Sequence, residues 1–193
     1  MKLSSNFVLD PTPLQRAELL RDTGITGMQL QAKLLDSIST LLTTLNADQN
    51  QLTSFARWIP NAQSLVRLSL NNNKIGPYLP SSFTNLISLK VLLMNNNLLQ
   101  QLPIGLEPLI NLEILRLDDN GITFLPSSIK RLTNLVVLSV ARNKLRGEFD
   151  FFRISLLSQL EELRLSGNFF RAPPSGVARL SKLKFFDWRP KTN

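Results

Sequence analysis

The chain has 193 residues, of which 43% are hydrophobic, with a mean hydropathy of +0.01 and a formal net charge of +8. This composition is typical of soluble globular proteins, and no stretch approaches the roughly 20 apolar residues that a membrane-spanning helix needs. The sequence contains neither cysteine nor histidine, which excludes disulfide frameworks, thiolate zinc sites and histidine-dependent catalytic or metal sites. We therefore expect no metal and no cofactor.

The first part of the chain, residues 1–40, does not share the pattern that follows it. Asp10-Pro-Thr-Pro stands before LQRAELLRD, which predicts a capped helix that Gly24 ends. A second helical stretch is expected from Thr26, because apolar residues recur on one face: Met28, Leu35, Ile38 and Leu42. We expect residues 1–40 to form a helical cap over the exposed end of a second region, residues 41–193.

A repeated frame fills the second region. It is clearest as Leu65-x-x-Leu68-x-Leu70-x-x-Asn73-x-Ile75, and its first leucine recurs at positions 42, 65, 89, 112, 135, 160 and 183. The last copy is partial, so the region holds six repeats and a fragment of another. Leucines at frame positions 4 and 6 point to one side of a short strand. One repeat cannot bury that side alone, so we expect the repeats to stack around a continuous core.

Two further features recur along the repeats: an asparagine in every strong copy and a Leu-Pro pair in several of them. An asparagine follows the strand, where its amide can satisfy turn backbone groups, and we expect these side chains to form a hydrogen-bonded ladder: Asn50, Asn73, Asn97, Asn120, Asn143 and Asn168. The return half carries Leu79-Pro80, Leu102-Pro103 and Leu125-Pro126, followed by apolar residues three apart. Proline suits the first turn of a helix, and this spacing favours 3₁₀ or short helical segments.

These residues resemble the leucine-rich-repeat family over about residues 40–189. The resemblance implies an α/β repeat solenoid, a right-handed superhelix with a concave parallel β-sheet and a convex side of 3₁₀, short helical and loop segments. The Leu-Pro return is similar to the 23-residue intracellular subtype. Asn73-Lys-Ile-Gly-Pro and Asn143-Lys-Leu-Arg-Gly depart from that subtype towards plant-type repeats, and Ala172-Pro-Pro stands where Leu-Pro is expected.

The resemblance places the variable positions of each strand frame on the concave side. There the sequence predicts an apolar centre inside a polar rim rich in arginine, which is how protein-binding sites are commonly built. Strand propensity alone would also favour β-branched residues, although it gives no reason for Leu93. The predicted protein-binding residues are Arg67, Val91, Leu93, Ile114, Arg116, Asp118, Val137, Arg142 and Arg164.

The C-terminal end of the frame is rich in aromatic residues. Phe185, Phe186 and Trp188 lie in the last strand copy, and only five residues follow. We expect a missing segment, a partner or a second copy of the chain to cover this edge. Residues 179–191 also carry five basic residues and one acidic residue, which indicates a solvated surface or, alternatively, a contact with phosphate.

The leading functional expectation is a non-catalytic scaffold or interaction module that binds a protein or peptide. One alternative is a ribonucleoprotein or nucleic-acid-associated component that uses the basic charge. Another is the recognition domain of a larger receptor, ubiquitin-ligase or effector protein. No catalytic residue is predicted, because Asp118-Asp119 and Glu161-Glu162 are neighbours on strand frames and should point to opposite sides.

The sequence also bears on location. It has no cysteine, no Asn-x-Ser/Thr glycosylation site and no apolar run of signal-peptide length before Pro11. These absences favour the cytoplasm, with the nucleus as the other possibility.

Overall fold

The computed structural model describes residues 8–9, 40–54, 59–146, 154–189 and 191. The helical cap expected over residues 1–40 therefore lies almost wholly outside the described residues. None of the helices within the described ranges combines the length and the apolar character that crossing a bilayer requires.

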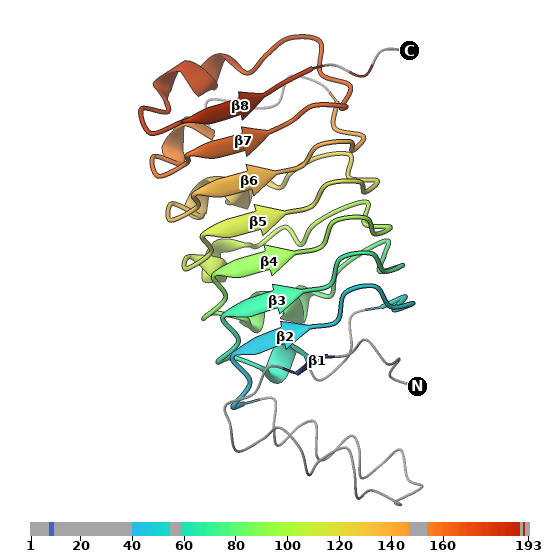
Figure 1. Ribbon diagram of the computed structural model, residues 1–193. Coiled ribbons are helices and arrows are strands. Elements are labelled where there is room, and N and C mark those ends of the chain that lie inside the picture. Colours follow the sequence, from blue (N-terminus) through green and yellow to red (C-terminus); the bar gives the residue numbers. More distant parts are fainter. Residues whose placement is uncertain (1–7, 10–39, 55–58, 147–153, 190, 192–193) are drawn as a thin grey trace, which may run out of the picture.

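A single eight-stranded sheet runs the length of the molecule, with its strands in sequence order (Figure 1). β1 is antiparallel to β2, and every later pair is parallel. The predicted parallel sheet is confirmed. Each strand is three residues long except the first: β1 Val8–Leu9, β2 Thr44–Asn46, β3 Arg67–Ser69, β4 Val91–Leu93, β5 Ile114–Arg116, β6 Val137–Ser139, β7 Glu162–Arg164 and β8 Phe185–Asp187.

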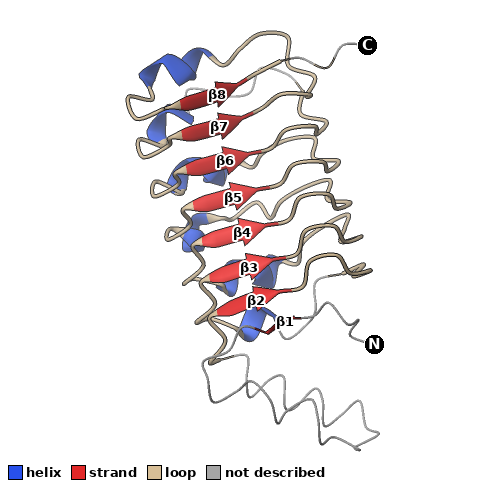
Figure 2. Cartoon of the chain, viewed as in Figure 1, coloured by secondary structure: helices blue, strands red, loops and turns tan. Residues whose placement is uncertain are grey.

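Short 3₁₀ helices form the opposite side of the coils, as the sequence predicted (Figure 2). Pro80 and Pro126 each stand one residue before such a helix, with extended backbone at φ −65°. The sequence placed proline in the first helical turn, but the structure puts it one residue earlier, where its fixed φ sets the extended entry to the turn. The helices are η2 Ile59–Asn61, η3 Ser81–Asn85, η4 Glu107–Leu109, η5 Ser127–Arg131, η6 Ile154–Leu156 and η7 Ser175–Arg179.

The frame leucines fill one continuous core between the sheet and the 3₁₀ side. Leu68, Leu115 and Leu163 occupy the central register position of their strands and are at most 2% exposed. Burial of each such side chain contributes about 1.5–3 kcal/mol. Phe186 holds the same register position on β8 but is 38% exposed, because no described strand pairs with the far edge of β8.

The frame asparagines bind backbone groups in their own and neighbouring coils. Asn143 is representative: its Nδ2 donates to the carbonyls of Leu117, Val140 and Ala141, at 2.9, 3.1 and 3.1 Å. Its Oδ1 accepts the N–H of Ile122 at 3.0 Å. The carbonyls of Leu117, Val140 and Ala141 each accept a second donor, from Asn120, Asn168 and Asp119 respectively, so the amides join successive coils into one network. The same arrangement recurs at Asn73, Asn97 and Asn120.

The residue immediately before each ladder asparagine has a left-handed backbone conformation. Six coils place a residue there with φ between 51° and 71°. Gly167 is the one glycine of the set, and a Cβ at that position would lie 2.9 Å from Cγ of Arg142. The coils can therefore stack closely only where this corner accepts a positive φ. The non-glycine residues are Gln49, Asn72, Asn96, Asp119 and Arg142.

Candidate functional site

The concave side of the sheet presents two rows of side chains, one from each outward position of the three-residue strands. Parallel register places equivalent residues side by side. The first row reads Thr44, Arg67, Val91, Ile114, Val137, Glu162 and Phe185. The second reads Asn46, Ser69, Leu93, Arg116, Ser139, Arg164 and Asp187.

An apolar patch lies in the middle of these rows. Val91 pairs with Ile114, which pairs in turn with Val137, and Leu93 lies beside Arg116. All four aliphatic side chains are half-buried, so each retains surface that a partner could cover. The structure therefore brings together the four apolar residues that the sequence placed at the centre of the site. We refer to Val91, Leu93, Ile114 and Val137 as the apolar patch.

One carboxylate on β7 binds two predicted arginines. Glu162 lies 3.1 Å from Nη2 of Arg116, two strands away, and 2.6 Å from Nε of Arg164 on its own strand. The guanidinium of Arg164 also lies 4.5 Å from the centre of the Phe185 ring, a cation–π distance. Sequence reasoning left Glu162 out of the site. The available signal was its place in the row of Val137, since a carboxylate among arginines on one face will pair with them.

Arg67 has a different environment at the other end of the apolar patch. Its side chain is exposed, and its register neighbours Thr44 and Val91 carry no charge. Asp48 is the acidic residue of the preceding coil, but its oxygens accept hydrogen bonds from Ser69 Oγ and from Asn71 N and Nδ2. Among the residues that the structure describes, no carboxylate lies within ion-pair distance of Arg67.

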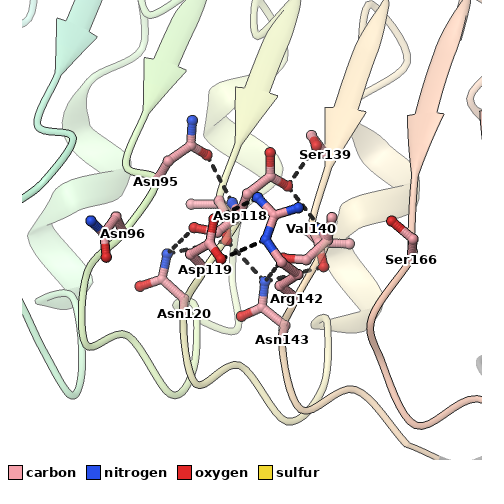
Figure 3. A network of polar contacts seen from close by, with 12 residues as sticks. Asn95, Asn96, Asp118, Asp119, Asn120, Ser139, Val140, Arg142, Asn143 and Ser166 are labelled. Atoms are coloured by element: carbon pink, nitrogen blue, oxygen red, sulfur yellow. Dashed lines mark hydrogen bonds and ion pairs between the residues drawn. The ribbon is translucent and has the colours of Figure 1, made fainter. Parts of the chain in front are cut away.

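Asp118, a predicted binding residue, is engaged within the molecule (Figure 3). Its Oδ1 accepts the hydroxyl of Ser139 at 2.6 Å and the N–H of Ala141 at 2.8 Å. The N–H of Asp118 itself donates to Oδ1 of Asn95 at 2.8 Å. Equivalent bonds join Asn71 to Asn95 and Asp48 to Asn71. A second ladder, built by frame position 7, therefore runs beside the asparagine ladder, and Asp118 belongs to it.

Arg142 lies on the turn after β6, at the rim of the concave face. Its Nε and Nη2 donate to the two carboxylate oxygens of Asp119, both at 2.6 Å (Figure 3). These hydrogen bonds raise the pKa of Arg142 above its usual value, against the opposing effect of partial burial. The structure thus joins Arg142 to the neighbouring coil rather than to the apolar patch.

The acidic residues of the described part of the chain do not gather into a metal-binding cluster. No group of three acidic side chains there is arranged to hold a metal ion. Asp119 pairs with Arg142, and Glu161 pairs with Lys184 at 2.8 Å. The adjacent carboxylates that the sequence considered as acid–base pairs therefore have separate partners.

Comparison with known proteins gives the same architecture. The family profile described as Leucine Rich Repeat matches residues 64–86 and 111–132. No curated protein sequence matches the chain. Among solved structures, the leucine-rich-repeat ectodomain of the Arabidopsis thaliana membrane receptor kinase GASSHO1/SCHENGEN3, in complex with CASPARIAN STRIP INTEGRITY FACTOR 2, superposes with a TM-score of 0.74. It is 31% identical, over 79% of this chain and 19% of that chain.

Two other solved structures are also similar. The plant peptide hormone receptor RGFR1, in complex with RGF2, has a TM-score of 0.69 and 29% identity over 77% of this chain and 24% of that one. A leucine-rich-repeat protein of Leptospira interrogans has a TM-score of 0.59 and 30% identity over 79% and 45%. The chain thus spans about a fifth to under half of the length of these structures. The recurrent frame, the stacked parallel coils and these matches identify the chain as a leucine-rich-repeat protein.

Proposed function

We propose that the chain is a non-catalytic interaction module that binds an extended segment of another protein across its concave sheet. The apolar patch is the observation that carries this proposal. Its side chains stand on three adjacent strands, keep accessible surface and have charged residues at both ends. An apolar centre with a polar rim is the usual composition of a protein-binding surface. A scaffold role would be one use of such a module.

The similar structures support a peptide as the partner. Two of the solenoids that superpose on this chain are receptors in complex with CASPARIAN STRIP INTEGRITY FACTOR 2 and with RGF2. Their likeness also favours a second candidate, in which these coils are the recognition part of a larger receptor-type protein. It gives no support to the cytoplasmic location or to the intracellular repeat subtype, both of which stay predictions from the sequence.

The ribonucleoprotein alternative has less support. Two lysines of the basic C-terminal segment have partners on the preceding coil: Lys182 donates to Gln159, and Lys184 pairs with Glu161. The concave centre is aliphatic, whereas surfaces that bind single-stranded nucleic acid stack bases on aromatic rings. RNA binding that weakens steeply with salt would favour this alternative over ours.

The test is a matched pair of aliphatic-to-aspartate variants. Peptides are selected from a displayed random library on the folded protein, and their affinities are then measured by fluorescence anisotropy. Leu93→Asp places a charge in the apolar patch and should weaken binding by about tenfold or more. Ile104→Asp places the same charge on the return side of a coil, where Ile104 is 78% exposed, and should leave affinity unchanged.

Both variants are checked by circular dichroism and thermal unfolding, so that a loss of fold is not mistaken for a loss of binding. If a folded Leu93→Asp protein bound the peptides as tightly as the unaltered protein does, the binding surface would not be at the concave centre. Loss of binding in both variants would also count against the proposal.

A further inference from the structure

We infer that the segment bound on the concave face is acidic, with one carboxylate opposite Arg67 and aliphatic side chains over the apolar patch. The inference rests on the proposed function, since it assumes that the concave face is the docking surface. It adds the chemical class of the partner, which the apolar patch alone does not determine.

The carboxylates of this face have partners within the chain, whereas one of its arginines has none among the described residues. The described carboxylates all have donors or cations within the chain: Asp48, Asp118, Asp119, Glu162 and Asp187. A basic residue of a partner would have to share carboxylate groups that already accept hydrogen bonds within the chain. Arg67 has no such partner among the described residues, so an incoming carboxylate gains an ion pair without breaking one.

Arg116, on the other side of the apolar patch, also has unused hydrogen-bond donors. Arg116 and Arg164 share the carboxylate of Glu162. By contrast, Asp187, the register neighbour of Arg164, accepts the hydroxyl of Ser166 and lies 3.9 Å from Arg189. Arginine has five N–H donors, and Arg116 uses only Nη2 in this contact. A second acidic residue of the partner can therefore bind Arg116 while Glu162 stays paired with Arg164.

Strand spacing sets the distance between the two cationic positions. Arg67 lies on β3 and Arg116 on β5, two strands apart. Neighbouring strands are about 4.8 Å apart, and Arg116 lies two residues further along its strand than Arg67, so the span is about 12 Å, or three to four residues of an extended chain. The partner segment that fits has two acidic residues separated by two or three others. Its intervening aliphatic side chains then cross β4 over Val91 and Leu93.

The experiment is a charge-swap selection with a matched control. A displayed library of random peptides is selected in parallel on the unaltered protein, on Arg67→Glu and on Arg131→Glu. Arg131 is an exposed arginine in η5, on the return side, so its variant carries the same change in net charge. We expect acidic residues, with aliphatic residues between them, to dominate on the unaltered protein and on Arg131→Glu.

Arg67→Glu should remove the acidic preference at one position and select a basic residue there instead. For one selected peptide, replacing the matching Asp with Asn should weaken binding to the unaltered protein about fivefold. The same replacement should have no effect on binding to Arg67→Glu.

The outcomes separate this inference from the proposed function. Peptides that are lost on Leu93→Asp but show no acidic preference would overturn the inference and leave concave docking intact. The same result follows if Arg67→Glu selects the same peptides as the unaltered protein. Peptides whose binding changes with neither Leu93→Asp nor Arg67→Glu would overturn both the inference and the proposed function.

Discussion

The carboxylate of Asp118 accepts the backbone N–H of Ala141 at 2.8 Å, and Ala141 has no side-chain acceptor to offer the next coil. Asp48, Asn71 and Asn95 each make the same bond to the residue one coil further on. The position-7 ladder thus joins successive coils up to Ala141 and stops there. The interruption gives the first prediction.

Ala141→Asn should raise the free energy of unfolding by about 1 kcal/mol, because its Oδ1 can accept the N–H of Ser166 as Asn95 does for Asp118. Urea unfolding followed by circular dichroism measures the change. Ala141→Val is the matched control, since it adds bulk at this buried position without an acceptor. If the asparagine variant is no more stable than the valine variant, the ladder bond does not stabilise the fold.

Asn143→Ala should be destabilising by about 2 kcal/mol, because it leaves the N–H of Ile122 without its acceptor and removes one of the two donors to the carbonyls of Leu117 and Val140. Asn50→Ala removes an equivalent amide that is only part-buried and donates to Ala47 and Asp48. Its effect should be clearly smaller when both are measured by urea unfolding. Similar losses for the two variants would contradict a role for burial in this ladder.

Gly167→Ala should lower stability by about 1–2 kcal/mol, because φ is +71° there and the new Cβ would meet Arg142 at 2.9 Å. Gly105→Ala is the control: its Cβ would meet only the end of the Glu107 side chain, at 3.3 Å. Thermal unfolding of both variants provides the comparison. Adding Arg142→Ala to Gly167→Ala should recover part of the loss, since it removes the contacting Cγ.

Arg142 itself combines a stabilising ion pair with an unfavourable backbone, at φ 51°. Both Arg142→Ala and Arg142→Gly remove the pair with Asp119, but only glycine relieves the left-handed conformation. We expect the glycine variant to be more stable than the alanine variant by about 1 kcal/mol. In regular helices and strands the order is the opposite, because alanine there is more stabilising than glycine. An alanine variant of equal or greater stability would show that the corner carries no strain.

Much of the fold could be predicted because one physical constraint repeats. Leu68, Leu115 and Leu163 must be buried, and their spacing fixes the length of each coil. Asparagine at a fixed offset predicted where the turn would need hydrogen bonds. These features are local in sequence, so periodicity reveals them.

The charged residues were less predictable, because their partners lie one or two coils away. Asp118 has the appearance of an exposed loop carboxylate in the sequence, but register brings Ser139 and Ala141 within hydrogen-bond distance. Glu162 binds Arg116 across 46 residues of sequence. Only the lateral stacking of strands reveals such pairs, and frame position alone does not distinguish a carboxylate that binds a partner from one that supports its neighbour.

The order of the strands along the sheet has a mechanical consequence. Because β2 to β8 follow the sequence, each coil is held mainly by the coils on either side of it, with the Arg116–Glu162 pair as a longer contact between β5 and β7. A stretching force applied to the two ends therefore loads the coils in series, and an outer coil peels off while the interior keeps its hydrogen bonds. Extension should therefore proceed in small successive steps, with coils unfolding one after another from the ends.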